Sequence, residues 1–175
     1  IETGIDLYKL PLQEKKDILC SCIYGIDIDI HAVEVAKFSL LIKLIEDETA
    51  PSVSEVVPIL PDLGDNIQFG NSLVSQTELN GISGANRQMM EIAPFDWSTI
   101  NNGCGFDVII GNPPYVNTEG MHALLPSAEV EVYKKKYKTS HKQFDKYFIF
   151  IEQAINKINE NGLVCYIVPN KFFKI

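Results

Sequence analysis

The stretch Phe106-Asp-Val-Ile-Ile-Gly-Asn-Pro-Pro-Tyr115 decides the fold that the rest of the chain can adopt. Its run 106–110, which ends in the β-branched residues Val108, Ile109 and Ile110, is typical of a short strand that is buried on both faces of a parallel sheet. Gly111-Asn112-Pro113-Pro114 ends the strand, because neither proline has an N–H for a ladder and an asparagine before proline is driven out of the helical region. Ligands bind at the carboxyl ends of strands in open α/β sheets. The stretch therefore predicts a rigid turn that carries an amide and a ring at a ligand-binding edge.

An amide and a ring at such an edge suit the alkylation of an amino group on a heteroaromatic base. That nitrogen is a poor nucleophile, because its lone pair is delocalised into the base. The Asn112 side-chain carbonyl and the Pro113 backbone carbonyl can each accept one amino hydrogen and stabilise the positive charge that develops there. Tyr115 can stack on a base that has left the duplex. A plain strand-terminating turn with a surface tyrosine is the alternative interpretation.

With the apolar strand before it and the tyrosine at its end, Asn112-Pro113-Pro114-Tyr115 resembles the catalytic motif (D/N/S)-P-P-(Y/F/W) of the N6-adenine DNA methyltransferases. The resemblance implies a Rossmann-like α/β fold, S-adenosylmethionine as the cofactor, and DNA with a flipped adenine as the substrate. It also implies direct in-line transfer of the methyl group from sulfur, without a covalent enzyme intermediate and without a metal. Asn112, Pro113, Pro114 and Tyr115 are then the catalytic residues.

The first half of the chain has the pattern of a mononucleotide-binding unit. Residues 11–20 predict a helix with a proline near its first turn, and residues 22–27 predict a strand. Residues 31–48 predict a helix that Ala50-Pro51 ends. Its apolar residues, which recur with the period of a buried stripe, are 32, 33, 35, 36, 40, 41, 44 and 45. A strand, an acidic turn and a helix form half of such a unit.

Asp27 lies at the carboxyl end of the predicted strand, where an acidic residue of a dinucleotide fold takes the ribose hydroxyls. A turn or a cap is the alternative for a single aspartate, and Asp29 is the better placed of the two to cap the helix. The sequence Tyr24-Gly-Ile-Asp-Ile-Asp29 resembles the second cofactor motif of the same family. The resemblance implies that Asp27 holds the cofactor ribose and that Ile28 lies against its adenine ring.

Residues 66–73 predict a short strand and a turn that resemble the family's third motif. Asn71 replaces the usual aspartate there, and an amide oxygen can still accept a hydrogen bond from the cofactor's 6-amino group. Ser72, beside it, is assigned to the same site. Residues 75–104 predict a long excursion with one helical piece at 85–92 and no assigned function, in which Trp97 is expected to pack in a core.

Residues 116–142 predict another loop, which ends in basic residues interleaved with tyrosines. The lysines that can follow a phosphate backbone are Lys134, Lys135, Lys136, Lys138 and Lys142. A solvated, mobile segment is the alternative. Residues 143–160 predict an amphipathic helix that Asn161-Gly162 caps, and residues 162–168 a buried strand. These parts resemble the family's fifth and sixth motifs, and Phe148 is expected to line the cofactor pocket.

Charge is divided unevenly along the chain. The net charge is −8 overall, but residues 1–133 hold 6 Lys and Arg against 20 Asp and Glu, whereas residues 134–175 hold 9 against 3. Phosphate contacts are therefore expected in the second part. The four cysteines lack the spacing of a zinc site, and neither a membrane span nor a signal peptide is evident, so a cytoplasmic location is expected.

The domain organisation predicted from the resemblance is a partial catalytic domain over 1–175. Residues 11–74 form its cofactor half, 75–104 the excursion and 105–175 its catalytic half, without a target-recognition domain. The family's first motif, Phe-x-Gly-x-Gly, is not found, so the central first strand of the sheet is expected to be missing. We expect a fragment of a type I or type IIG restriction–modification enzyme, inactive alone, that dimerises through unpaired strand edges or is partly disordered.

Two other hypotheses remain at this stage. The same turn can serve a protein-glutamine N5- or RNA guanine N2-methyltransferase, since each substrate offers a planar amide or aryl amine. A non-catalytic nucleotide- or DNA-binding module would keep the fold without the reaction. The intact Asn112–Tyr115 turn favours an enzyme, whereas the absent first motif favours a binding module.

Overall fold

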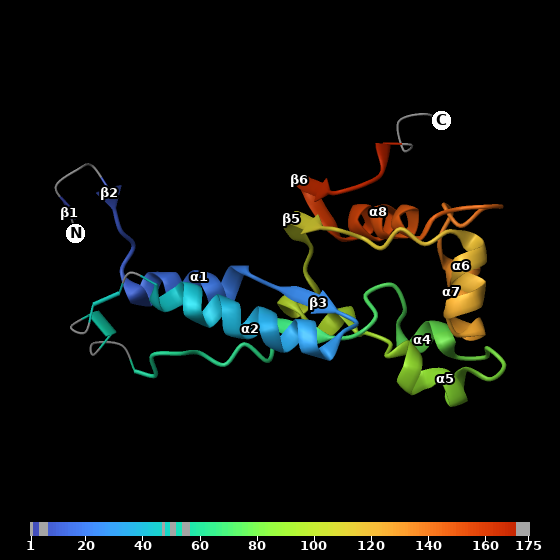
Figure 1. The fold of residues 1–175 in the computed structure, drawn as a ribbon, viewed down its shortest axis with the longest axis horizontal. Coiled ribbons are helices and arrows are strands. Elements are labelled where there is room, and N and C mark those ends of the chain that lie inside the picture. The colour runs from blue at the N-terminus through green and yellow to red at the C-terminus, as the bar shows by residue number, and fades with distance from the viewer. Residues whose placement is uncertain (1, 4–6, 47, 50–51, 54–56, 171–175) are drawn as a thin grey trace. The chain divides into compact units, whose positions relative to one another are not determined.

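The computed structural model describes residues 2–3, 7–46, 48–49, 52–53 and 57–170. The chain divides into two compact units, and each is considered by itself. The first unit contains Ile1–Gly70 and Thr99–Asn101, and the second contains Asn71–Ser98 and Asn102–Ile175. Helices and strands are mixed in both (Figure 1), and the strands among the described residues pair in three two-stranded sheets. Two of these sheets are parallel, as the predicted α/β class requires.

The first unit is built on a short parallel pair of strands. Its elements are β1 (Glu2–Thr3), β2 (Leu7–Tyr8), α1 (Leu12–Cys22), β3 (Gly25–Asp27), α2 (Ile30–Ile45) and β4 (Ile67–Phe69). Strands β1 and β2 are antiparallel, and β3 runs parallel to β4. The buried apolar side chains of this unit include Leu12, Leu19, Val33, Leu44, Leu63 and Ile67.

A buried amide explains where α1 ends. The Asn66 side chain is 5% exposed, and its Nδ2 donates to the carbonyl oxygens of Cys20 at 2.8 Å and Ile23 at 2.9 Å. The carbonyls at the end of a helix have no partner within it, so this amide stabilises the last turn. Helix α1 thereby extends through Cys22, and the predicted strand begins three residues later than expected, at Gly25.

Helix α2 agrees with the prediction at its start and differs at its end. Asp29 caps it as predicted, since its side chain accepts from the His31 N–H at 2.8 Å. The helix ends at Ile45 because Glu46 adopts an extended conformation, and the predicted terminator Ala50-Pro51 lies outside the described residues. Val35, which the predicted stripe buries, is 64% exposed. The buried stripe is therefore wrong at this position.

The second unit combines a helical core with a two-stranded parallel sheet. Its elements are α4 (Gln76–Leu79), α5 (Ala85–Ile92), β5 (Phe106–Gly111), α6 (Thr118–Leu124), α7 (Ser127–Lys136), α8 (Lys146–Lys157) and β6 (Ile158–Tyr166). Two short 3-10 helices, Trp97–Thr99 and Asn101–Gly103, each contain residues of both units. Helix α7 packs against α4, α5 and α6, whereas α8 packs against β6. The core thus surrounds α7.

Two segments that were predicted as loops, 75–104 and 116–142, contribute to this core. The helical piece expected at 85–92 is α5, with the expected bounds, but Leu79, Ile82 and Ile92 of the surrounding excursion are also buried. The loop expected over 116–142 is wrong, because it holds α6 and α7. Asn117 begins α6 by accepting from the Gly120 N–H at 2.8 Å. A single polar cap therefore opens a helix whose sequence has no clear apolar period.

The connection from α8 to β6 is shorter than expected. The predicted helix over 143–160 ends at Lys157, because Ile158 already pairs with Phe106 of β5. Asn161 has the left-handed conformation expected of a cap, with φ of 66°, but it forms an irregularity within β6. A Cβ on the next residue, Gly162, would lie 2.9 Å from the Asp107 carbonyl oxygen, so glycine is required there.

Strands β5 and β6 are less buried than the prediction requires. Val108 and Leu163, which pair, are 57% and 64% exposed, and Ile110 is 76% exposed. The apolar side chains of these strands led to the prediction that both faces of the sheet are buried. A two-stranded sheet cannot bury both faces of its strands, even though α8 packs against β6. None of the helices in the described residues has the length and hydrophobicity that a membrane-spanning segment needs.

Candidate active site

The turn expected at the end of β5 is present. Gly111 is the last residue of β5 and pairs with Tyr166 of β6, and the Ile167 N–H donates to the Gly111 carbonyl at 3.1 Å. A Cβ on Gly111 would lie 3.0 Å from the Tyr166 ring, so the glycine permits close packing of strand and ring. Asn112 follows at the carboxyl end of the parallel pair and is exposed.

Tyr115 bonds back onto this turn. Its hydroxyl lies 2.9 Å from Asn112 Oδ1 and 2.8 Å from the Ile167 carbonyl oxygen, so one phenolic proton is shared between two acceptors. The Tyr115 ring is 50% exposed and meets the edge of Tyr147 at a centroid distance of 6.2 Å. Asn112 Oδ1 retains acceptor capacity, and the ring retains open surface. The predicted role of Asn112 requires a free acceptor position, and the predicted stacking role of Tyr115 requires an open ring face.

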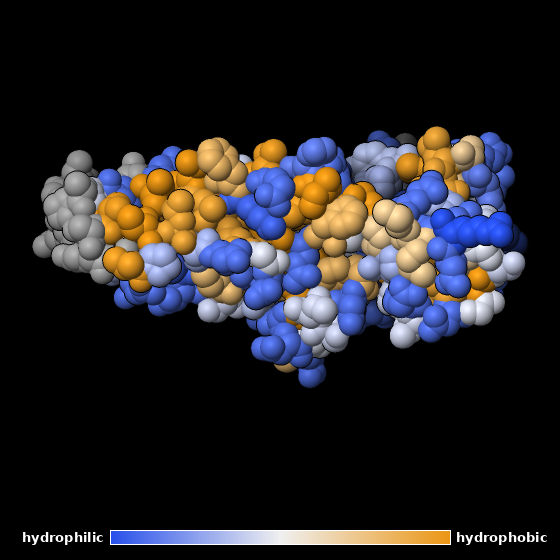
Figure 2. Space-filling view, turned by 90° about the horizontal axis from the view of Figure 1, so that it is seen from below, coloured by the Kyte–Doolittle hydropathy of each residue, from blue (hydrophilic) through white to orange (hydrophobic). Residues whose placement is uncertain are grey.

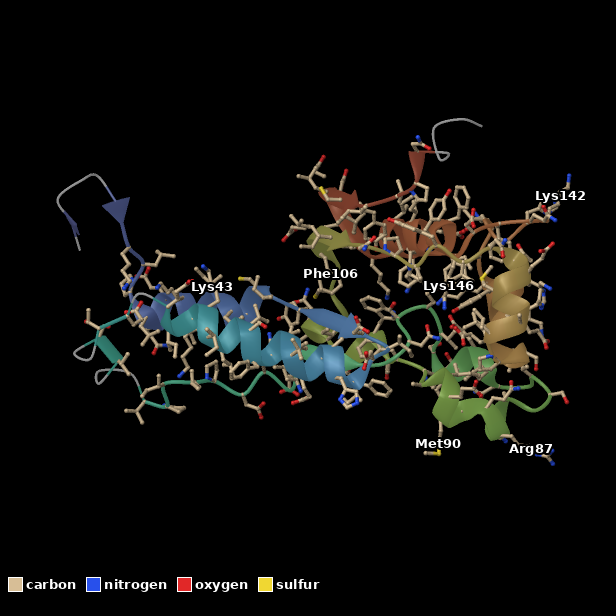
Figure 3. All side chains as sticks on the ribbon, viewed as in Figure 1. Lys43, Arg87, Met90, Phe106, Lys142 and Lys146 are labelled. Atoms are coloured by element: carbon tan, nitrogen blue, oxygen red, sulfur yellow. The ribbon has the colours of Figure 1, made fainter. Side chains whose placement is uncertain are left out.

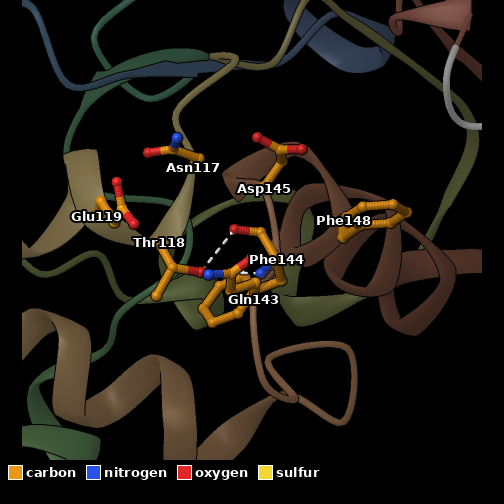
Figure 4. Close-up of a pocket in the computed structure, with 7 residues that line it drawn as sticks. All are labelled: Asn117, Thr118, Glu119, Gln143, Phe144, Asp145 and Phe148. Carbon is orange, nitrogen blue, oxygen red and sulfur yellow. Dashed lines mark hydrogen bonds between the residues drawn. The ribbon is translucent and has the colours of Figure 1, made fainter.

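A pocket of about 280 Å³ adjoins the segment that follows the turn (Figure 4). Its lining residues are Asn117, Thr118, Glu119, Gln143, Phe144, Asp145 and Phe148. The Thr118 hydroxyl donates to the Phe144 carbonyl at 2.9 Å and accepts from the Phe144 N–H at 2.8 Å, which fixes one wall. Phe148, predicted to line a cofactor pocket, stacks on Tyr147 at 4.4 Å and lines this one. Its ligand stays a prediction.

Asp27 occupies the carboxyl end of β3 in the first unit. Its Oδ1 accepts from the Asp29 N–H at 2.8 Å, and its side chain is exposed. A carboxylate has about four acceptor positions, so Asp27 can still accept from two hydroxyl groups. Ile28 beside it is 52% exposed and presents an apolar surface. An exposed carboxylate beside an exposed apolar side chain suits a ribose with an apolar base next to it.

Asn71, predicted to lie in a turn after a short strand, is buried in the second unit. It is 7% exposed, its Oδ1 accepts from the Leu73 N–H at 3.1 Å, and its Nδ2 donates to Glu129 at 3.0 Å. The Ser72 carbonyl accepts from Trp97 Nε1 at 3.0 Å. Asn71 and Ser72 are thus tied to the second unit. Glu129 escaped the sequence analysis because its segment had been predicted as a loop.

The lysines predicted to contact DNA lie on and after α7. Lys135 pairs with Glu131 at 2.6 Å and Lys136 with Glu78 at 2.9 Å, while Lys134 Nζ lies 3.1 Å from a His122 ring nitrogen. Lys138 and Lys142 follow the helix, and Lys142 points away from the protein (Figure 3). These residues offer an exposed basic surface, part of which is already paired.

The tyrosines among these lysines are not available to nucleic acid. Tyr133 and Tyr137 are 0% and 3% exposed, and the Tyr137 hydroxyl donates to the Leu73 carbonyl at 2.7 Å. Burial raises the pKa of both phenols above the usual range. The prediction that these tyrosines and lysines together follow a phosphate backbone is therefore wrong for the tyrosines. Helical geometry turns their rings into the core and the lysines outward.

Comparisons with known proteins give a family whose members resemble most of this chain. The profile of the Eco57I restriction-modification methylase family matches residues 21–175. The type II restriction enzyme and methyltransferase RM.Eco57I of Escherichia coli is 46% identical over 168 residues, which cover 96% of this chain and 16% of that protein. The type II methyltransferase M.PaeR7I of Pseudomonas aeruginosa is 32% identical over 69 residues, 39% of this chain and 11% of that protein. The chain thus spans a small part of these relatives.

Proposed function

Because the chain belongs to the Eco57I restriction-modification methylase family, we propose that it transfers a methyl group from S-adenosylmethionine to the N6 amino group of adenine in DNA. The observation that carries the proposal is the turn after β5, where Asn112 is exposed and its Oδ1 is held by the Tyr115 hydroxyl. In this proposal residues 11–74 serve cofactor binding and residues 105–175 serve catalysis, within a larger restriction–modification enzyme.

The residues of the turn act on the amino group of a flipped adenine. S-adenosylmethionine supplies the methyl group, bound to a positively charged sulfur. Asn112 Oδ1 and the Pro113 carbonyl oxygen accept the two amino hydrogens, and this directs the nitrogen lone pair toward the methyl group. As the new N–C bond forms and the S–C bond breaks, both oxygens stabilise the positive charge that appears on nitrogen, and the nitrogen then loses one proton to water. Pro114 keeps the turn rigid, and the half-exposed Tyr115 ring stacks on the base.

The cofactor contacts proposed here follow from the chemistry of the side chains. Asp27 accepts from the ribose hydroxyls with the acceptor positions that Asp29 leaves open, and Ile28 packs on the adenine ring. Asn71 Oδ1 has one lone pair beyond its bond with Leu73, which accepts from the 6-amino group. Two further contacts, both proposed on sequence grounds, come from Ser72 and from Phe148.

The test is methyl transfer from labelled S-adenosylmethionine to DNA by the full-length protein, with N6-methyladenine measured after digestion to nucleosides. We expect Asn112→Ala to slow the transfer about 10²- to 10³-fold, the cost of removing one preorganised stabilising group. Asn86→Ala, an exposed asparagine on α5, is the matched control and should leave the rate unchanged. Methylated guanine in RNA or methylated glutamine, with unmethylated DNA, would contradict the proposed substrate.

The proposed DNA surface is tested through salt. Replacing Lys135, Lys138 or Lys142 by alanine should weaken binding of any DNA sequence and lower the salt dependence of affinity by about one counterion for each lysine that contacts phosphate. Lys43→Ala on α2 is the control, because Lys43 belongs to the first unit and not to this lysine segment. An unchanged salt slope in all three variants would remove these lysines from the interface.

A further inference from the structure

Glu129 lies at the centre of a buried polar cluster in the second unit. It is 3% exposed, and its Oε1 accepts from Asn71 Nδ2 at 3.0 Å, from Lys146 Nζ at 3.4 Å and from the Tyr133 hydroxyl. Lys146 points toward α7 (Figure 3), and its Nζ lies 5.4 Å from the centre of the Tyr133 ring. A carboxylate in this position needs such partners, because an isolated buried charge is strongly destabilising.

The cluster leaves the Asn71 amide a single orientation. The Glu129 carboxylate only accepts hydrogen bonds, and the Leu73 N–H only donates one. The amide nitrogen must therefore face Glu129, and the amide oxygen must face the Leu73 N–H at 3.1 Å. A reversed amide would place oxygen against carboxylate and N–H against N–H. The second lone pair of Oδ1 is consequently presented in one fixed direction.

We propose that Glu129 is a positioning residue that orients the Asn71 amide so that its oxygen, and never its nitrogen, meets the cofactor's 6-amino group. The inference rests on the proposed function, in which Asn71 takes that contact. It also accounts for the amide at this position: an aspartate at 71 would set a second carboxylate beside Glu129, and two adjacent buried carboxylates cannot both be ionised. Glu129 therefore requires asparagine at residue 71.

The first experiment measures how well the full-length protein distinguishes S-adenosylhomocysteine from S-inosylhomocysteine, in which a 6-oxo group replaces the 6-amino group. An acceptor fixed at residue 71 should favour the amino form about 10- to 100-fold, since the oxo form loses the bond and opposes two oxygens. In Glu129→Leu residue 129 no longer accepts from Asn71 Nδ2, so the Asn71 amide is free to turn its oxygen toward Lys146. The preference should fall to about threefold or less. Glu131→Leu, exposed on the same helix, should retain it.

The outcomes separate the inference from the proposed function. A full-length protein that binds neither compound contradicts the proposed function, and the inference with it. Binding without any preference removes Asn71 from the 6-position and also overturns the inference. A strong preference that survives in Glu129→Leu overturns the inference alone. Each result is an equilibrium affinity and requires no turnover.

A second measurement needs no cofactor and remains valid if Glu129→Leu binds poorly. Asn71→Asp alone should lower the midpoint of unfolding, because it opposes Glu129. The double variant Asn71→Asp with Glu129→Gln should regain most of that loss, since one carboxylate then faces one amide, with the order reversed. Additive losses in the double variant would show that the two side chains do not constrain each other, and would overturn the inference.

Discussion

Helix α2 is the more apolar of two helices, but helix α7 is the more deeply buried. Helix α2 is mainly apolar, yet its buried side chains are Val33 and Leu44, while Val35 and Phe38 are 64% and 65% exposed. Helix α7 contains two glutamates and ends in three lysines, yet Tyr133 within it is 0% exposed. Apolar composition alone therefore does not decide which helix of this chain is enclosed.

The number of neighbouring elements accounts for the difference. Helix α7 packs against α4, α5 and α6, so most of its circumference is covered, and even Glu129 lies inside. Helix α2 packs against α1, β3 and β4, and those strands have three residues each. The apolar side chains that these elements do not cover gather on the surface of the first unit (Figure 2). Burial follows from enclosure by several layers.

The largest expected effect compares one aromatic residue from each helix. Tyr133→Ala should lower the free energy of unfolding by about 3–5 kcal/mol, because it opens a cavity in a closely packed core. Phe38→Ala should cost less than about 1 kcal/mol, since Phe38 is 65% exposed. Urea unfolding of the two variants beside the unmodified chain measures both. Equal losses would show that α2 is as enclosed as α7, and would break the comparison.

A smaller effect isolates the polar part of the α7 core. Tyr133→Phe keeps the ring and removes the hydroxyl that donates to Glu129, so the buried carboxylate loses one of its donors. We expect a loss of about 1–3 kcal/mol in the free energy of unfolding. Tyr24→Phe is the control, because the Tyr24 hydroxyl donates to the Ser21 carbonyl at an exposed site, and it should change stability by less than about 0.5 kcal/mol.

The smallest effect concerns a carboxylate of the first unit. Hydrogen bonds from Lys15 and Ser52 lower the pKa of Glu48 from its usual 4.5 to about 2. Since the pKa is depressed on folding, the stabilisation is present above about pH 5 and is lost as the pH falls toward 2. With allowance for screening we expect a loss on the order of 1 kcal/mol. The midpoint of thermal unfolding should fall less between about pH 5 and pH 2 in Glu48→Gln than in the unmodified chain. The same fall in both proteins would contradict the prediction.

Membership of a restriction–modification methyltransferase family was predicted from the motif Asn112–Tyr115, and the family match confirms it. The turn after β5 and the Asp29 cap were also predictable, because proline and a short acidic side chain act over a few residues. The roles proposed for Asp27 and Asn71 in cofactor binding remain predictions.

Long-range contacts account for what the sequence could not predict. Asn66 ends α1 across more than forty residues, and Glu129 meets Asn71 across a separation of 58 residues. Ile158 leaves its helix because it pairs with Phe106. No local period or propensity reports such partners. The strands around the turn have the composition of a fully buried sheet, yet Val108 and Leu163 are exposed in a two-stranded one.

The sequence by itself determined the turn chemistry, the strand before it and the family, because each depends on neighbouring residues and on the fixed φ of proline. The tertiary structure alone decided that a lysine-rich segment is a core helix and that Asn71 is held by Glu129. The physical reason is that burial and hydrogen-bond partners are properties of the whole packed unit. The same side chain contributes to stability or to a surface according to which elements surround it.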